Sequence, residues 1–259
     1  MKISAFVAFI AIIFLAACGS VEVASVWRTN DIVIDGKIAD WQGYLVEVKG
    51  TGVSVGVVND ADYVYVGLSA TDARAAAQAF RLGLYVWLDP KGGSDRVLGI
   101  HYPTGLNWED FAGPPEMDSM GVLRKPSRDA GETAEVEILG PGRDEQTQLD
   151  RGELKGIEVA ASRRGGIFVY EIKVPLAKSE AAPFAAESAP GKMLGVGFDT
   201  AGPNILMPGR GLGGVPGGMG RGMSGGSFGR GGMRGAGARA PLKLWLKVRL
   251  AAAPSAPFH

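Results

Sequence analysis

Oxygen-bearing side chains stand at the ends of two expected strands, where they could bind a metal ion. Asn59, Asp60 and Asp62 come just before one apolar run, and Asp89 stands at the end of another. Calcium binds clusters of carboxylate and amide oxygens, so these four residues predict a calcium site. The same residue types at strand ends commonly make turns instead, and both interpretations stay open.

Aromatic side chains form a second group that could do chemistry. In the run at 82–88 the aliphatic residues fall on one face of a strand, while Tyr85 and Trp87 fall on the other. Flat rings suit the apolar faces of pyranose sugars, so this aromatic face predicts a platform for a saccharide. A loop or the second layer of the fold could equally cover it, which would make the rings structural.

The residue types that catalysis needs are scarce. The chain has one cysteine, which excludes an internal disulfide and a multi-cysteine zinc site, and only two histidines, His101 and His259. No Gly-x-Ser-x-Gly motif is followed by a usable histidine. Acidic pairs occur at 109–110 and at Glu135 and Glu137, but adjacent and alternating acids do not encode the carboxylate separations of glycoside hydrolysis. The protein is therefore predicted not to be an enzyme.

The elements that position these residues are predicted to be strands. Short runs of β-branched and aromatic residues are separated by Gly, Asn, Asp and Pro about every ten residues, which is typical of an all-β, antiparallel β-sandwich. Helix signals are few: Thr71 and Asp72 could cap a helix through Phe80, and residues 176–187 could hold another turn or two. The expected strands are 32–34, 53–58, 63–68, 82–88, 97–102, 135–139, 156–161, 167–174, 194–199 and 242–250.

The C-terminal part of the chain is cationic. The strand expected at 242–250 alternates five apolar residues with Lys243, Trp245, Lys247 and Arg249, so these four should point outward. Before it, the glycine-rich residues 201–240 contain no acid and are predicted to be a disordered insertion inside the domain. Their five arginines predict weak attachment to anionic envelope polymers or lipid headgroups, although a tolerated insertion without any ligand would look the same. The net charge of the whole chain is zero, so we expect no nucleic-acid partner.

The N-terminal residues predict a targeting signal. Met1 and Lys2 precede a 12-residue apolar stretch, which fits a secretory signal and is too short for a membrane span. It ends in Leu-Ala-Ala-Cys-Gly, which resembles the bacterial lipoprotein box, so Cys18 is expected to carry a diacylglycerol. Residues 1–17 would then be the signal peptide, 18–25 a tether, 26–250 the sandwich and 251–259 a tail. Gly19, where aspartate would favour inner-membrane retention, favours a lipid anchor in the outer membrane of the cell envelope.

Six short motifs are spread between Trp27 and Leu250. They are Ile34–Lys37 with Asp40–Trp41, Val57–Val66, Val86–Asp89, Tyr170–Pro175, Gly195–Phe198 and Leu244–Trp245. In this order they resemble the landmarks of family 9 carbohydrate-binding modules and the related DOMON-like domains. The resemblance implies a sandwich of jelly-roll or immunoglobulin-like type, and in glycan-binding members it implies an aromatic clamp and calcium-binding carboxylates. Trp41, Trp87 and Trp108, with Tyr85, are the clamp candidates.

Two functions of different class follow from these observations. The first is a non-catalytic envelope lipoprotein that binds a carbohydrate or a similar envelope-exposed ligand through an aromatic-lined sandwich. The alternative is a structural or assembly lipoprotein that contacts a protein partner and has no small-ligand site.

Overall fold

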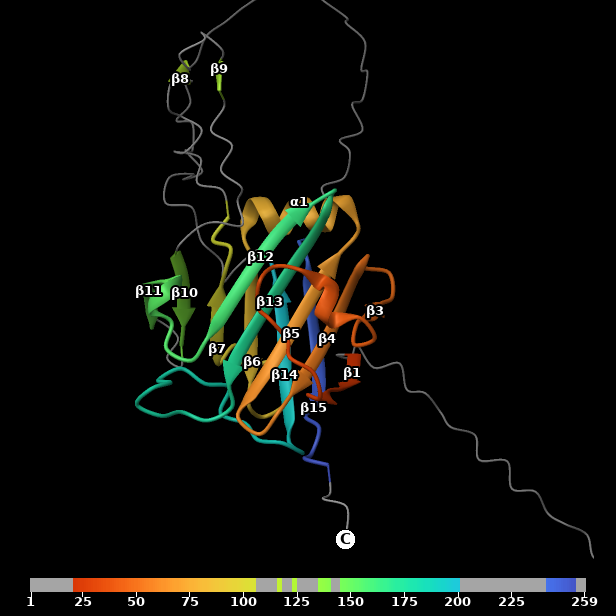
Figure 1. Cartoon of the computed structure of the whole chain (residues 1–259), viewed down its shortest axis with the longest axis vertical. Helices are drawn as coiled ribbons and strands as arrows, with labels where there is room; N and C mark the ends of the chain where they lie inside the picture. The colour runs from red at the N-terminus through yellow and green to blue at the C-terminus, as the bar shows by residue number, and fades with distance from the viewer. Residues whose placement is uncertain are drawn as a thin grey trace, which may run out of the picture.

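Two β-sheets pack face to face and make the chain an all-β sandwich (Figure 1). The computed structural model describes residues 21–105, 116–117, 123–124, 135–140, 145–200 and 241–254. Sheet A has seven strands in the order β1-β15-β14-β6-β7-β10-β11, and sheet B has six, in the order β12-β13-β5-β4-β2 with β3 paired to β4. The strands of sheet A are β1 (Val21–Ala24), β6 (Tyr85–Asp89), β7 (Leu98–His101), β10 (Glu135–Leu139), β11 (Gln146–Asp150), β14 (Met193–Asp199) and β15 (Lys243–Arg249).

In the described part of the chain, an α-helix and several short elements accompany the strands of the two sheets. The helix α1 (Ala73–Leu82) covers one end of the sandwich (Figure 1). A small hairpin, β8 (Glu116–Met117) and β9 (Leu123–Arg124), stands apart from both sheets in the strand pairing. Sheet B contains β2 (Val26–Trp27), β3 (Val46–Val48), β4 (Val53–Asn59), β5 (Tyr63–Ala70), β12 (Glu158–Arg164) and β13 (Ile167–Pro175), and the 3-10 helices are η1 (Ile38–Trp41) and η2 (Arg151–Glu153).

The core lies between the sheets because alternate residues of each strand point inward. Val64, Val66 and Leu68 of β5 are fully buried, and Leu246 and Val248 of β15 meet them from sheet A as members of the same cluster. The two-residue period read from the sequence therefore identified the core correctly at these strands.

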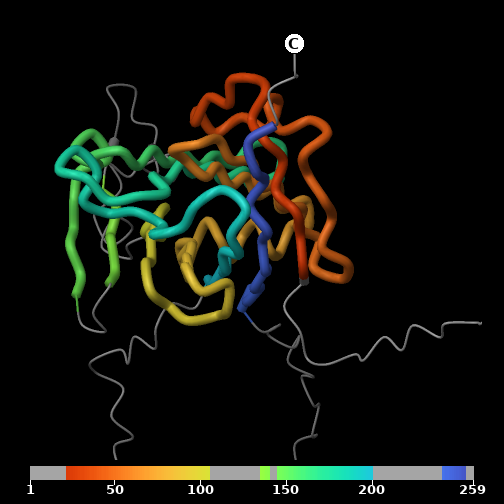
Figure 2. The backbone as a smooth tube through the Cα atoms, turned by 90° about the horizontal axis from the view of Figure 1, so that it is seen from below, coloured from red at the N-terminus to blue at the C-terminus, as the bar shows by residue number. Residues whose placement is uncertain are grey.

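The sheets are mixed, which corrects the expectation of a purely antiparallel sandwich. β1 runs parallel to β15, and β2 runs parallel to β4, while the other pairs are antiparallel. The N-terminal segment crosses from sheet A to sheet B at Ser25, between β1 and β2. Figure 2 shows this red segment beside the blue β15. Within the described residues, Val21–Ala24 therefore belongs to the sandwich, so this part of the predicted tether 18–25 is strand.

Several other elements differ from the sequence prediction. Residues 32–34 form a loop, and residues 176–187 contain turns and a β-bridge but no helix. The helix predicted through Phe80 is present but extends to Leu82, which was expected to begin a strand. Its N-cap is Asp72, whose carboxylate accepts hydrogen bonds from the backbone N–H groups of Arg74 and Ala75 at 3.0 Å each.

Several predictions fall on residues outside the described part of the chain. These are the signal peptide 1–17, the lipidation site Cys18, Trp108 and the insertion 201–240. Among the helices of the described residues, none is long and apolar enough to cross a membrane.

Candidate binding groove

The four predicted calcium ligands are divided between the sheets. Asn59, Asp60 and Asp62 lie at the turn between β4 and β5, whereas Asp89 ends β6 in sheet A. The Asp89 carboxylate is fully buried and caps its own turn, accepting the N–H groups of Lys91 at 2.9 Å and of Asp95 at 3.0 Å. Within the described ranges, no group of three or more His, Cys, Asp or Glu side chains is placed to hold a metal ion. The structure therefore does not bring these four residues together.

Asn59 has a structural position instead. Its side chain is fully buried, and its amide oxygen accepts hydrogen bonds from the Ser25 hydroxyl and from the N–H of Ala251 at 2.8 Å. Its amide nitrogen donates to the carbonyls of Asp60 at 3.1 Å and of Ala251 at 3.0 Å. Asn59 thus ties the N-terminal segment, the β4–β5 turn and the segment after β15 to one another.

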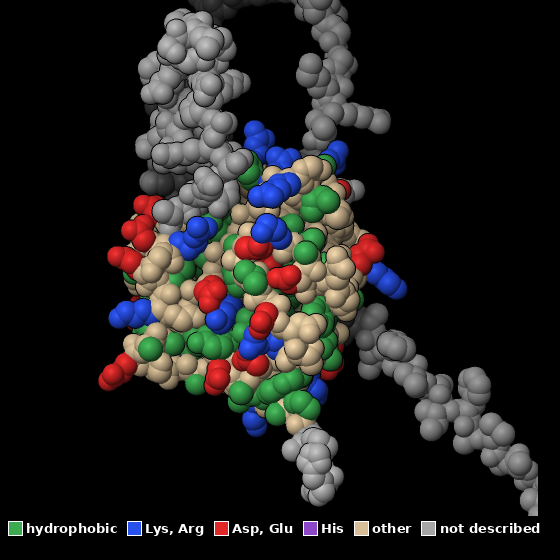
Figure 3. All heavy atoms as spheres, in the orientation of Figure 1, with side chains coloured by type: hydrophobic (Ala, Val, Ile, Leu, Met, Phe, Trp, Pro, Cys, Tyr) green, Lys and Arg blue, Asp and Glu red, His purple; other side chains and the backbone are tan. Residues whose placement is uncertain are grey.

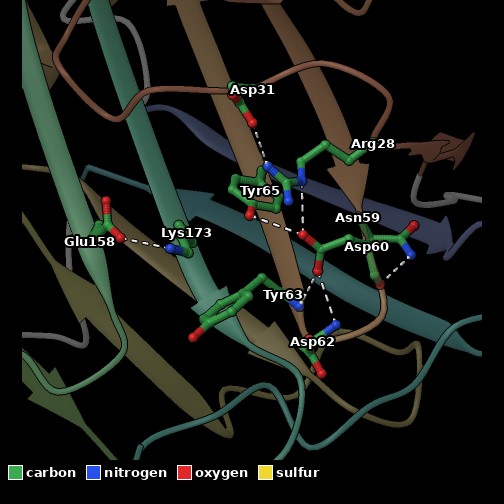
Figure 4. A network of polar contacts seen from close by, with 9 residues as sticks. All are labelled: Arg28, Asp31, Asn59, Asp60, Asp62, Tyr63, Tyr65, Glu158 and Lys173. Atoms are coloured by element: carbon green, nitrogen blue, oxygen red, sulfur yellow. Dashed lines mark hydrogen bonds and ion pairs between the residues drawn. The ribbon is translucent and has the colours of Figure 1, made fainter.

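Asp60 organises the same turn through its carboxylate (Figure 4). It accepts the N–H groups of Asp62 at 2.9 Å and Tyr63 at 2.8 Å and the hydroxyl of Tyr65 at 3.1 Å, and it pairs with Arg28 at 2.8 Å. Burial opposes ionisation of Asp60, but these four donors outweigh it and hold its pKa below the usual value.

Replacing this carboxylate is expected to remove part of the acid sensitivity of the fold. The folded pKa of Asp60 lies below the unfolded value of about 4, so the ionised group stabilises the protein above pH 4 and this stabilisation is lost as the pH falls through the folded pKa. Asp60→Asn should therefore lower the unfolding midpoint by about 5 °C at pH 7, for a loss of about 2 kcal/mol, and by progressively less as the pH falls below about 4, because the wild-type carboxylate then becomes protonated. Thermal unfolding between pH 2 and pH 7 measures this.

Asp31→Asn is the matched control, since the Asp31 side chain is 96% exposed and contacts the same arginine at 3.2 Å. It should shift the midpoint by less than about 2 °C at any pH. A deficit in Asp60→Asn that stayed constant across the pH range would contradict the account.

The predicted aromatic face exists but is closed. Tyr85 and Trp87 point away from the core on the outer face of sheet A. The Tyr85 ring stacks on His101, with centroids 3.8 Å apart, and lies parallel to Trp87 at 6.1 Å. Tyr85 and Trp87 are only 3% and 4% exposed. Neither ring therefore offers an open face for a sugar in this structure.

Charged side chains complete this aromatic cluster. The Arg96 guanidinium lies 5.3 Å from the Trp87 centroid and bonds the buried carboxylate of Asp199 at 2.5 Å. The Nδ1 atom of His101 contacts Glu137 at 2.7 Å. That hydrogen bond lowers the pKa of Glu137, against the opposing effect of burial.

Trp41 is a packing residue on the outer face of sheet B. Its side chain is fully buried, and its indole lies against Gly67, where an added Cβ would come within 2.5 Å of the ring. The indole N–H donates to Glu171 at 2.7 Å. Trp41 therefore has no exposed ring face with which to clamp a ligand.

The carboxylate of Glu171 links this tryptophan to a surface loop. It is fully buried and accepts the backbone N–H groups of Gly36 at 2.5 Å and of Asp35 at 3.1 Å. Burial raises the pKa of Glu171, although its hydrogen bonds with Trp41, Gly36 and Asp35 act in the opposite direction. One side chain thus fixes the loop at 34–36 against sheet B.

An open groove of about 640 Å³ follows β12, the edge strand of sheet B that runs diagonally in green through the middle of Figure 1. Every residue from 157 to 164 lines it. Among the described strands β12 pairs only with β13, so backbone N–H and C=O groups on its free side face the groove. The volume is in the range of about 300–1,000 Å³ that is common for small-molecule sites.

The groove has two walls. The outer wall is the loop held by Glu171, and the Ser162 hydroxyl donates to the Gly36 carbonyl at 2.7 Å to fasten it to β12. The inner wall includes Phe80 of α1, whose ring carries the Arg163 guanidinium 5.3 Å from its centroid. Both walls are therefore fixed by contacts with sheet B.

Arginines dominate the charge of the groove. Arg151, Arg163 and Arg164 line it together with two acids, Asp35 and Glu158. Each acid already has a lysine partner: Asp35 bonds Lys37, and Glu158 pairs with Lys173 at 2.7 Å (Figure 4). The bond from Lys37, with a contribution from the charge of Arg164, lowers the pKa of Asp35. The arginines thus leave the groove with a cationic excess.

A tight turn presents two of these arginines. Arg164 and Ile167 pair at the end of the β12–β13 hairpin, leaving Gly165 and Gly166 as its two-residue loop. Both glycines have positive φ, 58° and 84°, as a type I′ turn requires. The turn places Arg163 and Arg164 at the exposed end of the strand.

The groove and the predicted ligand residues do not coincide. Trp41, Tyr85 and Trp87 are not among its lining residues, and Trp108 lies outside the described residues. Sequence reasoning missed Arg151, Arg163 and Arg164. The one local signal was the pair of arginines directly before two glycines, which indicates a hairpin end but not a groove.

Comparison with known proteins finds distant similarity in structure alone. No family model matches the chain, and no curated protein matches it. A family 9 carbohydrate-binding module from Caldicellulosiruptor kristjanssonii in complex with glucose is 12% identical, over 69% of this chain and 76% of that chain, with a TM-score of 0.34. The same family in complex with cellotriose gives 13% identity over 69% and 74%, with a TM-score of 0.32. At these values the similarity does not indicate what this chain binds.

Proposed function

We propose that the chain is a non-catalytic envelope lipoprotein that binds an anionic saccharide in the β12 groove. The observation that carries the proposal is the position of three arginines along one edge-strand groove of about 640 Å³. Guanidinium groups bind carboxylate, sulfate or phosphate substituents through paired hydrogen bonds. The free backbone edge supplies further donors and acceptors for hydroxyl groups, and the Ser162 oxygen, whose hydrogen is donated to Gly36, can accept a hydrogen bond.

The saccharide class rests on the motif resemblance, and the anionic character rests on the arginines. The aromatic clamp is not part of this proposal because Trp41, Tyr85 and Trp87 are buried. We propose further that a diacylglycerol on Cys18 displays the sandwich from the envelope, with the outer membrane favoured by Gly19. The Gly/Arg insertion would add weak attraction to anionic polymers.

The unpaired edge of β12 also supports a second function, binding of a partner protein. An unpaired strand edge can add a strand from a partner protein, which corresponds to an assembly role without a small-ligand site. The groove favours a saccharide because its outer wall is a fixed loop and its charged side chains converge on one volume. An acidic extended peptide is therefore included in the test as the competing ligand.

Calorimetric titration with trigalacturonate, maltotriose and an acidic nine-residue peptide separates these functions. We expect trigalacturonate to bind and Arg163→Ala/Arg164→Ala to weaken binding at least tenfold, since about 1.4 kcal/mol or more is lost with two charge-assisted contacts. Arg74→Ala/Arg81→Ala, on the exposed side of α1, is the charge-matched control and should bind like the wild type. Binding of the peptide alone would establish the assembly role, and equal effects of both variants would remove the groove as the site.

A further inference from the structure

A row of cations lies on the outer face of β15. Lys243, Lys247 and Arg249 are exposed, and Trp245 between them is half-buried. The alternate residues of the strand are apolar and enter the core. The structure therefore confirms that these side chains point outward, as the alternation predicted.

The cations of the row form no close ion pairs. Among the described residues, Lys243, Lys247 and Arg249 have no acidic partner within 4.0 Å. In the strand register Glu22 of β1 stands opposite Lys247, and Asp199 of β14 stands opposite Lys243. The Asp199 carboxylate is bonded to Arg96. By contrast, acids and bases intermingle across the face of sheet B in Figure 3.

The Trp245 ring lies close to the backbone of β14 because its register partner there, Gly197, has no side chain. A Cβ added at Gly197 of β14 would come within 2.7 Å of the indole, so the ring rests against the β14 backbone. Tryptophan flanked by cations suits the headgroup region of a membrane, where the ring is amphipathic and the charges meet lipid phosphates.

The row is close to the predicted lipid anchor. β1 pairs with β15 at the edge of sheet A, and Val21 of β1 follows Cys18 by three residues. Three residues span at most about 10 Å, and paired strands lie about 4.8 Å apart. An acyl group on Cys18 would therefore hold the membrane surface within reach of the row.

We propose that the outer face of β15 is a docking surface for anionic phospholipid headgroups. Docking through it would fix the orientation of the sandwich as well as its distance from the bilayer. The β12 groove lies in the other sheet, at the edge opposite β1 and β15, so it would stay open in the docked protein (Figures 1 and 2). The docking surface uses none of the groove residues and does not depend on saccharide binding.

Vesicle co-sedimentation tests the proposal without the anchor. The protein is the chain from residue 18 with Cys18→Ser, which retains every described element. We expect it to bind vesicles of phosphatidylglycerol and phosphatidylethanolamine in 0.1 M salt, and to bind phosphatidylcholine vesicles at least tenfold more weakly. Lys243→Gln/Lys247→Gln/Arg249→Gln should lower binding to the anionic vesicles at least tenfold, while its melting temperature and trigalacturonate affinity stay unchanged.

The control removes the same charge elsewhere. Arg74→Gln/Arg81→Gln/Lys155→Gln replaces three exposed cations away from β15 and should bind vesicles like the parent protein. Equal losses in both triple variants would show a net-charge effect and overturn the proposal, as would equal binding to both kinds of vesicle. As a second readout, Trp245→Phe should remove much of the blue shift in tryptophan fluorescence on vesicle binding, and an unchanged shift would contradict insertion of this ring.

Discussion

Replacing Glu171 with alanine is expected to destabilise the sandwich by about 3 to 5 kcal/mol. The change leaves three donors without their acceptor: the Trp41 indole N–H and the backbone N–H groups of Asp35 and Gly36. Buried groups that lose a partner cost about 1 to 3 kcal/mol each, and water can satisfy part of that loss near the loop. Urea unfolding at pH 7, followed by circular dichroism, measures the change.

The matched control for this substitution is Glu158→Ala on the neighbouring strand. Glu158 is exposed and pairs with Lys173 at the surface, so its removal should cost at most about 1 kcal/mol. Similar losses for the two variants would show that the bonds of Glu171 are not what stabilises this region.

Glu171→Ala is also expected to weaken ligand binding without touching the ligand. The carboxylate positions the loop at 34–36, which forms the outer wall of the groove. When the loop is released, the affinity for trigalacturonate should fall even under conditions where the variant is fully folded. Titration at low temperature in the absence of denaturant checks this, and unchanged affinity would show that the loop is not needed as a wall.

The second large effect is expected at Asn59. Asn59→Ala should cost about 2 to 4 kcal/mol, because the buried amide bonds Ser25, Asp60 and both backbone groups of Ala251. The loss should be greatest at β1 and β2, which are short and depend on this contact. Hydrogen exchange should therefore rise in residues 21–27 before it rises in β5.

Asp62→Ala is the control for Asn59, because Asp62 is exposed in the same turn. We expect it to change the free energy of unfolding by less than about 0.5 kcal/mol. The comparison also separates the structural account from the calcium interpretation. A structural Asn59 makes the loss independent of calcium, whereas stabilisation of the wild type alone by millimolar calcium would show that the amide is a ligand.

The core strands could be predicted because their signal is local. Residues such as Val64, Val66 and Leu68 alternate with residues of the opposite face, and this period is enough to mark the strand and its buried side. The helix α1 was predictable for a similar reason, since Asp72 caps it from within the same segment. The core strands and the helix can therefore be predicted from short stretches of sequence.

The N-terminal strands were harder to predict because their stability is not local. β1 and β2 have four and two residues, and they pair in parallel with β15 and β4. The partner of β1 is β15, near the end of the chain, and the partner of β2 is β4, about 30 residues further along. Residues 21–27 alone therefore do not distinguish a strand from a tether.

The amino-acid sequence by itself determined the composition of each strand face, the scarcity of catalytic residues and the outward cations of 242–250. Only the tertiary structure decided which faces are open. Tyr85 and Trp87 point outward as the alternation predicted, yet they are buried, while β12 is an edge strand whose groove is lined by arginines at the end of the strand and in η2. The physical reason is that alternation depends on neighbouring residues, whereas edge position and burial depend on contacts between segments far apart in the chain.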